Sequence, residues 1–376
     1  MRLITSGESH GKGLFAVIEG LPAGIFVDPD EINACLALRQ SGYGRGARQK
    51  IERDEVEILT GVRNLKTLGS PVTLAVWNRD YENWKEYMAA EGCDESKRKL
   101  TKVRPGHADL TGVKKYGQED ARNILERASA RETAVRVAAG TVCRQFLRAL
   151  GVEITGYVKR VGSIAEEKGY SFKEIKERRR PLLGMMSEEC ERAAVSEIDK
   201  AAESGDTLGG EIEIRVEGLG SGFGSCMSYN QKLDARLASA VMSVQAIKGV
   251  AFGLGFDAAK QFGSAVHDEI FYDEETGFYR KTNRAGGIEG GMSNGEEIVL
   301  CAAMKPIPTL MKGLNTVDYL TKEACRAATE RSDVTAITAC EIILESAVAC
   351  ELAAVVLERL GGDNVAEIKE RYRRLP

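Results

Sequence analysis

The stretch 120–150 constrains the fold most, because it joins a long helical pattern to a charge on its apolar face. Asp120 is a residue type that caps helices and Gly151 one that ends them, so a helix is predicted over 120–150. Small or apolar residues recur at helical spacing and mark one buried stripe: Ile124, Ala128, Val135, Ala138, Val142 and Phe146. This pattern is typical of a core helix.

Arg131 lies within that stripe, three residues after Ala128 and four before Val135. A guanidinium keeps its charge in proteins, and burying it without a partner is strongly unfavourable. An anionic partner for Arg131 is therefore expected inside the protein. The helix alone leaves two alternatives open: an internal salt bridge with an Asp or Glu, or an anionic ligand in a site walled by core helices.

The composition is typical of a soluble globular protein and argues against several other classes. Of the 376 residues, 43% are hydrophobic and 29% charged, and the net charge of −4 argues against a general nucleic-acid binder. Length alone indicates two domains or one large one. No apolar run reaches the roughly 18 residues of a membrane span, and the first residues do not resemble a signal peptide.

The nine cysteines are scattered and show no metal-ligand spacing. Because neither a CxxC pair nor a Cys/His cluster occurs, no metal site is expected. Their odd number and their positions in apolar segments predict reduced, mostly buried thiols, and hence a cytoplasmic protein.

The order of strand and turn patterns predicts antiparallel sheets. Strands are expected over 55–62, 72–77, 152–161, 209–219, 249–256 and 297–304, with turn residues between several of them. A second long helix, over 335–360, is rich in Ala, Ile, Val and Leu and is predicted to be buried on most sides, with Asp333 as its cap. Shorter helices are expected over 29–39, 187–204 and 230–246, and a surface loop or short helix over 80–99.

Two of the three histidines, His10 and His107, lie in glycine-containing loops, whereas His267 has a less distinctive context. Imidazole suits general acid–base chemistry near neutral pH, although a single loop histidine is more commonly structural. Several arginines could supply planar donors to carboxylates or phosphates: Arg39, Arg45, Arg48, Arg104, Arg127, Arg131 and Arg331.

The residues alone predict an enzyme for a small, phosphorylated polyanion without naming its reaction. No Ser/His/Asp elbow, Walker loop or zinc spacing occurs, which argues against the corresponding hydrolases, NTPases and metalloenzymes. The segment 283–295 holds too much glycine for an ordinary helix or strand. It is either a glycine-rich hairpin or a backbone that approaches a flat or anionic ligand.

Seven segments, in order along almost the whole chain, resemble the chorismate synthase family: 7–11, 39–46, 104–109, 126–133, 283–295, 305–310 and 331–333. Phe15 and the segment 222–230 depart from the family pattern. The resemblance implies an α+β fold with one large β-α-β sandwich domain over 1–376. In that domain the core helices lie between two antiparallel sheets, and the protein forms a homotetramer.

The resemblance also implies a reaction, the FMN-dependent trans-1,4-elimination of phosphate from 5-enolpyruvylshikimate 3-phosphate, which gives chorismate. This is the last common step of the shikimate pathway in aromatic amino acid biosynthesis. The reaction requires reduced FMN but has no net redox change. Whether the protein reduces its own flavin with NAD(P)H stays open, and the lack of an added reductase domain favours an external flavin reductase.

The same resemblance implies residue roles. His10 would protonate the departing phosphate, His107 would adjust the protonation of the flavin, and Asp333 would help flavin N5 accept the ring proton. The substrate would be bound by Arg39, Arg45, Arg48, Arg104 and Arg131. FMN would be bound by Arg127, Ala128, Ser129, Gln245, Ala246, Gly290, Lys305, Pro306, Ile307, Pro308, Thr309 and Arg331.

Two other functions remain open at this point. One is a phosphate-eliminating lyase that uses the histidines without flavin. The other is a binding protein that sequesters a phosphorylated metabolite or an RNA end through its arginine loops. The favoured hypothesis has a small-molecule substrate and neither a nucleic-acid nor a membrane partner.

Overall fold

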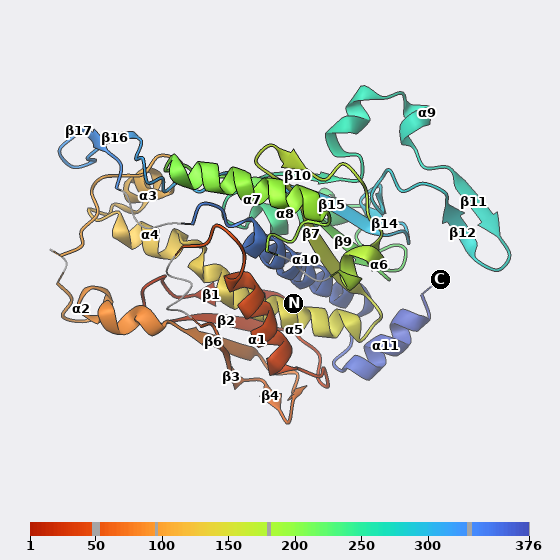
Figure 1. The fold of residues 1–376 in the computed structure, drawn as a ribbon. Coiled ribbons are helices and arrows are strands. Elements are labelled where there is room, and N and C mark those ends of the chain that lie inside the picture. Colours follow the sequence, from red (N-terminus) through yellow and green to blue (C-terminus); the bar gives the residue numbers. More distant parts are fainter. Residues whose placement is uncertain (47–52, 95–96, 179–181, 329–332, 376) are drawn as a thin grey trace.

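Two antiparallel sheets form the frame of the computed structural model, which describes residues 1–46, 53–94, 97–178, 182–328 and 333–375 (Figure 1). The first sheet has four strands in the order β1 (Arg2–Ser6), β2 (Gly13–Glu19), β6 (Val72–Trp77) and β3 (Val56–Thr60). The second has five in the order β10 (Ile247–Phe252), β15 (Ile298–Met304), β9 (Gly210–Glu217), β7 (Glu153–Val161) and β8 (Ile164–Ala165). All neighbouring pairs are antiparallel, as the strand and turn patterns predict.

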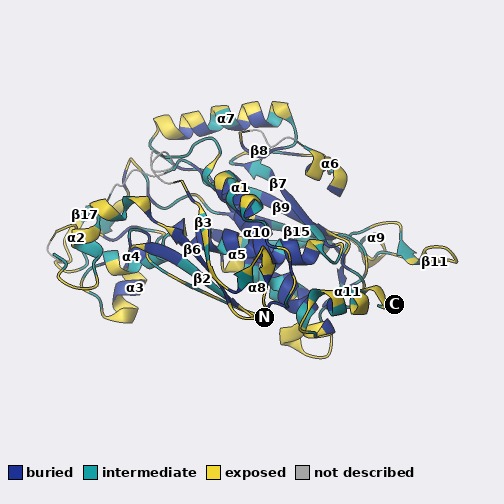
Figure 2. Cartoon of the chain, turned by 90° about the horizontal axis from the view of Figure 1, so that it is seen from below, coloured by how far each residue is buried: buried dark blue, intermediate teal, exposed yellow. Residues whose placement is uncertain are grey.

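Two long helices, α5 (Thr133–Arg148) and α10 (Ile337–Leu360), pack on each other and on the sheets. Helix α5 contacts β2 and β6 of the first sheet, whereas α10 contacts β7 and β9 of the second. Every residue from 337 to 349 is buried, which confirms the prediction for this helix (Figure 2). Helices α1 (Pro29–Gln40) and α8 (Leu233–Met242) pack against this pair.

The remaining elements are shorter or peripheral. Helix α7 (Glu188–Glu203) confirms the helix predicted over 187–204. Ser187 caps it, and it lies along the outside of the molecule (Figure 2). The others are α2 (Lys85–Met88), α3 (Asp109–Tyr116), α4 (Arg122–Ala128), α6 (Phe172–Glu177), α9 (Gly263–Val266), α11 (Val365–Arg373), β4 (Val62–Arg63), β5 (Lys66–Thr67), β11 (Ile270–Asp273), β12 (Gly277–Arg280), β13 (Ile288–Glu289), β14 (Met292–Ser293), β16 (Asn315–Val317) and β17 (Ala324–Arg326). Among the helices in the described ranges, none is both long and apolar enough to cross a membrane.

The single helix predicted over 120–150 is wrong, because the chain breaks at Ser129. Helix α4 ends there, Ser129 is extended (φ −61°, ψ 139°), and a 3-10 turn over Ala130–Glu132 leads into α5. The Ser129 hydroxyl accepts a hydrogen bond from the backbone N–H of Arg131 at 3.3 Å. This local bond competes with the helical one, so Arg131 lies at a junction between helices rather than within a continuous stripe.

The predicted cap of the second long helix is also wrong. Helix α10 begins at Ile337, and no side chain caps its first turn. Asp333 instead pairs with Arg45 at 3.0 Å and accepts the backbone N–H of Gly46 at 2.5 Å. The Asp333 carboxylate, which the sequence assigns to the helix cap, is therefore paired with an arginine from a loop far away in sequence.

The crossing of α5 and α10 depends on a glycine. A Cβ added at Gly140 would lie 2.3 Å from the Ser346 Cβ and 2.7 Å from the Ser346 carbonyl oxygen. The two backbones therefore approach too closely for any side chain at this position.

We expect Gly140→Ala to lower the free energy of unfolding by about 1–3 kcal/mol, because overpacking outweighs the roughly 1 kcal/mol gain in helix propensity. Denaturant unfolding measures the effect. Gly169→Ala is the matched control, since nothing lies within 4 Å of a Cβ at Gly169. Equal stability of the two variants would contradict the close crossing.

Candidate functional site

A cavity of about 610 Å³ is formed where the two long helices meet loops from both ends of the chain. Most of the site residues predicted from the sequence line it: His10, Arg39, Arg45, Arg104, His107, Ala128, Ser129, Arg131, Gln245, Ala246, Lys305, Ile307, Pro308, Thr309 and Asp333. These residues come from seven separate segments, so the fold brings together groups that are far apart in sequence.

Some predicted site residues do not line the cavity. Arg127 donates hydrogen bonds to the carbonyls of Thr5 and Gly7, at 3.1 and 3.2 Å. Gly290 is exposed in the turn between β13 and β14, and Pro306 is not a lining residue although its neighbours are. The glycine-rich segment thus contains a hairpin, which is the alternative that its composition left open. Two further predicted residues, Arg48 and Arg331, lie outside the described residues.

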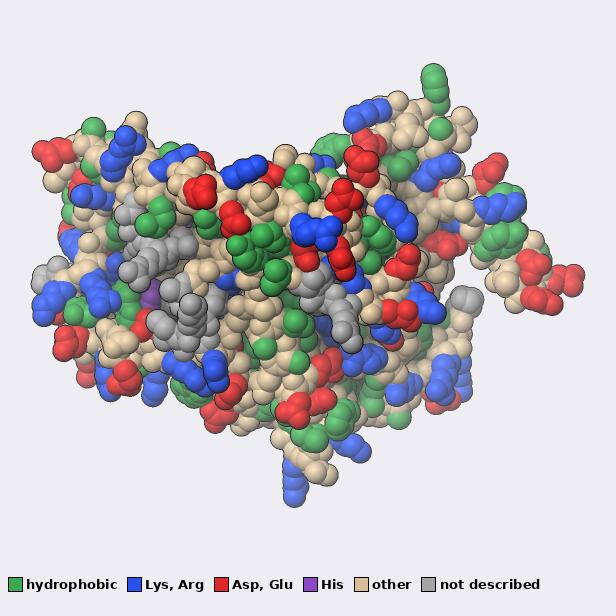
Figure 3. Space-filling model, viewed as in Figure 1, with side chains coloured by type: hydrophobic (Ala, Val, Ile, Leu, Met, Phe, Trp, Pro, Cys, Tyr) green, Lys and Arg blue, Asp and Glu red, His purple; other side chains and the backbone are tan. Residues whose placement is uncertain are grey.

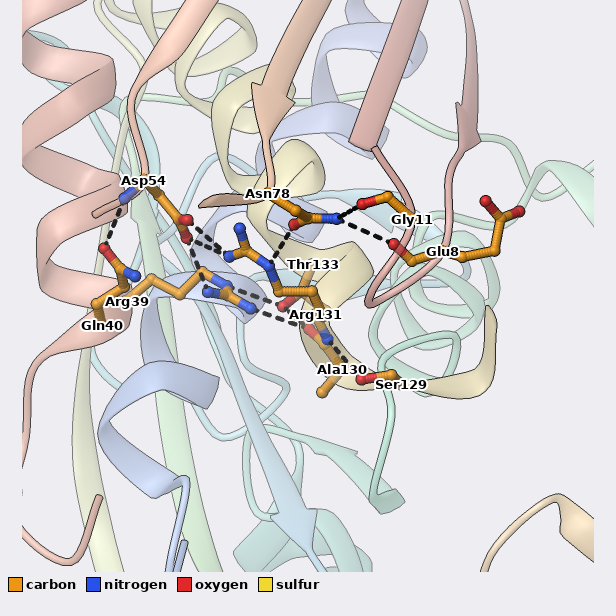
Figure 4. A network of polar contacts seen from close by, with 10 residues as sticks. All are labelled: Glu8, Gly11, Arg39, Gln40, Asp54, Asn78, Ser129, Ala130, Arg131 and Thr133. Carbon is orange, nitrogen blue, oxygen red and sulfur yellow. Dashed lines mark hydrogen bonds and ion pairs between the residues drawn. The ribbon is translucent and has the colours of Figure 1, made fainter. Parts of the chain in front are cut away.

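Asp54 connects two of the cavity arginines (Figure 4). Its carboxylate, whose side chain is 0% exposed, accepts from Arg131 Nη1 at 2.6 and 2.7 Å and from Arg39 Nη1 at 3.3 Å. Arg131 Nε donates to Asn78 Oδ1 at 3.0 Å. The internal salt bridge expected for Arg131 is therefore present. The same carboxylate thus fixes two guanidiniums at the cavity wall.

Arg39 is held firmly in place. Its Nε donates to Thr133 Oγ1 and its Nη2 to the Ala130 carbonyl, both at 3.0 Å. Burial lowers the pKa of Arg39 to about 9, Asp54 opposes this effect, and Arg131 adds to it. An anion in the cavity would relieve the repulsion between the two guanidiniums.

His10 is fixed by a buried acid and an aromatic ring. Its Nδ1 lies 3.0 and 2.9 Å from the two carboxylate oxygens of Glu126, and its ring stacks on Trp84 with centroids 3.9 Å apart. Burial alone would raise the pKa of Glu126, but hydrogen bonds and charge from His10, helped by Arg122, leave that pKa below its usual value. The carboxylate is thus ionised beneath His10.

His107 has a comparable arrangement. Its Nδ1 lies 2.5 Å from Asp109 Oδ1, and the same carboxylate accepts from Arg104 at 2.8 and 3.0 Å. Arg104 Nη1 also donates to Thr309 Oγ1 at 3.1 Å. Burial would raise the pKa of Asp109, but His107 and Arg104 hold it well below its usual range. The carboxylate therefore orients both Arg104 and His107 at the cavity wall.

Sequence reasoning missed these buried acids, although signals existed for two of them. Asp109 lies in the segment 104–109 with Arg104 and His107, and Glu126 lies in the segment 126–133 next to Arg127. Both segments contribute to the family resemblance. Asp54 lies in an acidic stretch whose sequence does not distinguish it from Glu52, Glu55 or Glu57.

Two polar atoms at the cavity wall have no partner among the described residues. They are the donor Arg45 Nε and the acceptor Gln245 Oε1, and both are buried. Leaving such atoms unsatisfied costs about 1–3 kcal/mol each, so the wall is complementary to a polar ligand. Ala246, next to Gln245, has a positive φ of 70°, a strained conformation for a residue with a side chain.

The chemistry of this cavity is that of a polyanion site. Within the described ranges, no group of His, Cys, Asp and Glu could hold a metal ion. The outer face in Figure 3 carries basic and acidic side chains interspersed, with no large basic patch. Arg39, Arg104 and Arg131 line the cavity, and the carboxylates of Asp54 and Asp109 that pair with them are fully buried. The site suits a small anion better than nucleic acid.

Comparisons with known proteins identify the family. A sequence model of the family described as chorismate synthase matches residues 1–357. The chorismate synthase of Geobacter sulfurreducens is 54% identical, over 99% of this chain and 97% of its own length. That of Caldicellulosiruptor bescii is 50% identical, over 100% and 99%. A crystal structure of chorismate synthase matches with a TM-score of 0.78 at 38% identity, over 99% of this chain and 96% of that one. This chain belongs to the chorismate synthase family.

Proposed function

We propose that this chain is a chorismate synthase that converts 5-enolpyruvylshikimate 3-phosphate to chorismate and phosphate with bound reduced FMN. The observation that carries the proposal is the shared cavity, which His10, His107 and four arginines from three separate segments line together. The proposal includes a single domain over 1–376 with α5 and α10 between the two sheets. It also includes a cytoplasmic homotetramer that receives its flavin from an external NAD(P)H-dependent reductase.

The arginines would bind the substrate, which carries one phosphate and two carboxylates. Arg39 and Arg131 both pair with Asp54 and line the cavity, where their guanidiniums would meet the ligand. Arg45 has an unsatisfied Nε at the wall, and Arg104 is oriented by Asp109. Arginine–phosphate pairs are strong where water is excluded. Arg48 completes the proposed substrate set, by resemblance alone.

The histidines would handle protons. His10 is held by Glu126 through Nδ1, so its Nε2 would donate a proton to the departing phosphate. Asp333, at the wall beside Arg45, would assist removal of the ring proton. His107, held by Asp109, would control the protonation of the cofactor. Together these roles account for the proton lost by the ring and the proton gained by the leaving group.

The cavity residues fit a flavin. Its volume of about 610 Å³ lies in the range of small-molecule sites, roughly 300–1,000 Å³. Gln245 Oε1 is an unsatisfied acceptor for a ring N–H, and residues of the 305–309 segment form part of the wall. Bound reduced FMN would supply electron density to the allylic system. The residues that would hold it are Ala128, Ser129, Gln245, Ala246, Lys305, Ile307, Pro308 and Thr309, with Arg127, Gly290, Pro306 and Arg331 proposed by resemblance.

We expect turnover under anaerobic conditions only when reduced FMN is present. Chorismate formation is followed by ultraviolet absorbance, together with release of inorganic phosphate. Turnover independent of flavin would favour a flavin-free lyase. Binding of the substrate without phosphate release would favour a sequestering protein.

We expect His10→Ala and His107→Ala each to lower kcat by about 10²-fold or more, since each removes a group for acid–base work. Stopped and continuous phosphate-release assays measure the change. His267→Ala is the control, because His267 does not line the cavity and should leave kcat unchanged. Full activity in either cavity variant would remove that histidine from the mechanism.

We expect Arg131→Met to weaken substrate binding by at least about tenfold, because a guanidinium donor and its positive charge are lost from the cavity wall. Its effect on stability should be smaller than for most broken buried pairs, since Arg39 remains beside Asp54. Calorimetric titration with substrate and denaturant unfolding separate the two effects. Unchanged affinity combined with a large loss of stability would make the salt bridge the whole role of Arg131.

A further inference from the structure

Glu126 makes more contacts with His10 than a simple ion pair requires. Its side chain is 0% exposed. Its Oε2 accepts from both the backbone N–H of His10, at 2.8 Å, and the ring Nδ1, at 2.9 Å. Its Oε1 lies 3.0 Å from the same Nδ1 and accepts from Arg122 Nη1 at 3.3 Å. One carboxylate therefore binds both the backbone and the ring of the histidine.

The backbone of α4 adds a further connection to the same loop. The Ser9 N–H donates to the Glu126 carbonyl at 2.9 Å. From the other side, Asn78 Nδ2 donates to the carbonyls of Glu8 and Gly11 at 3.1 and 2.7 Å. The loop is therefore held on both sides of His10, and the direction of its side chain is set by fixed elements.

The plane of the His10 ring is held by Trp84. The two rings stack with an interplanar angle of 27°. The guanidinium of Arg98 lies 4.0 Å from the Trp84 ring, and Arg122 Nε donates to the Arg98 carbonyl at 2.6 Å. Arg122 thus connects Arg98, next to Trp84, with Glu126. The Trp84 ring and the Glu126 carboxylate, which both contact His10, are therefore linked through Arg122.

This geometry permits one tautomer of neutral His10. An ionised carboxylate can only accept hydrogen bonds, so the Nδ1 beside it must carry a proton. Nε2 is then the nitrogen that exchanges a proton with a ligand in the cavity. When the imidazolium donates that proton, an N–H bond breaks at Nε2, an O–H bond forms on the leaving group, and neutral His10 retains its Nδ1 proton.

We propose that Glu126 is a positioning residue that sets the tautomer of His10, so that its Nε2 is always the nitrogen that delivers the proton. This inference rests on the proposed function in one respect only, namely that the proton on Nε2 is delivered to the departing phosphate. His107 offers a contrast, because its Nδ1 lies near both Asp109, at 2.5 Å, and the donor Arg104 Nη2, at 3.0 Å. Its tautomer is less strictly determined than that of His10.

The direct test is nitrogen-15 NMR of solid, histidine-labelled protein, in which protonated and bare ring nitrogens are well separated. The chain has only three histidines, so His10→Asn and His107→Asn assign the signals. We expect neutral His10 to carry its proton on Nδ1. A proton on Nε2 in the unmodified protein would overturn the proposal, whether or not the chain is a chorismate synthase.

Glu126→Gln provides the second test. The amide keeps the volume of the carboxylate but lacks its charge. Its NH₂ group must face either the His10 backbone N–H or Arg122, and both of these are themselves donors. We expect a mixture of His10 tautomers and a loss in kcat of about 10²-fold or more, with KM changed by less than about twofold. Unchanged tautomer and kcat would overturn the proposal.

Glu345→Gln is the matched control. Glu345 is also fully buried and pairs with Arg144 at 2.9 Å, but it does not line the cavity. We expect it to lower the free energy of unfolding while leaving the His10 tautomer and kcat unchanged. An equal loss of kcat in this variant would assign the effect of Glu126→Gln to general destabilisation and overturn the proposal.

Discussion

The structure depends on the sharing of one buried carboxylate by two arginines. Asp54 pairs with both Arg39 and Arg131 and fixes their guanidiniums at the cavity wall. In a medium of low polarity, two guanidiniums held side by side attract an anion far more strongly than they would at a surface. Burial, with a contribution from Arg131, lowers the pKa of Arg39, and an anion bound in the cavity would oppose this shift.

The fold makes this arrangement possible through the break at Ser129. An unbroken helix would carry Arg131 along the core face, whereas the 3-10 turn places it at the end of α5, beside Asp54 and Asn78. The close crossing of α5 and α10 at Gly140 leaves the ends of both helices to line the cavity. The core therefore both supports the site and supplies part of its wall.

Much of this could be predicted from the sequence, for identifiable reasons. The antiparallel strands and the buried helix α10 follow from apolar periodicity, which burial imposes directly. Arg131 was correctly expected to be buried beside an anion. The break at Ser129 depended on one local hydrogen bond, and the partner of Asp333 came from a loop far away in sequence. Neither type of contact leaves a periodic pattern, so neither could be predicted from pattern alone.

The acidic side chains fix the orientation of the basic side chains that line the cavity. A carboxylate lies beside each of these groups: Asp54 beside Arg39 and Arg131, Asp109 beside Arg104 and His107, Glu126 beside His10, and Asp333 beside Arg45. Each carboxylate uses its oxygens on backbone N–H groups or neighbouring side chains, so the ligand does not have to displace it. A ligand therefore meets cations that are already oriented, and it loses less entropy on binding than it would among flexible side chains.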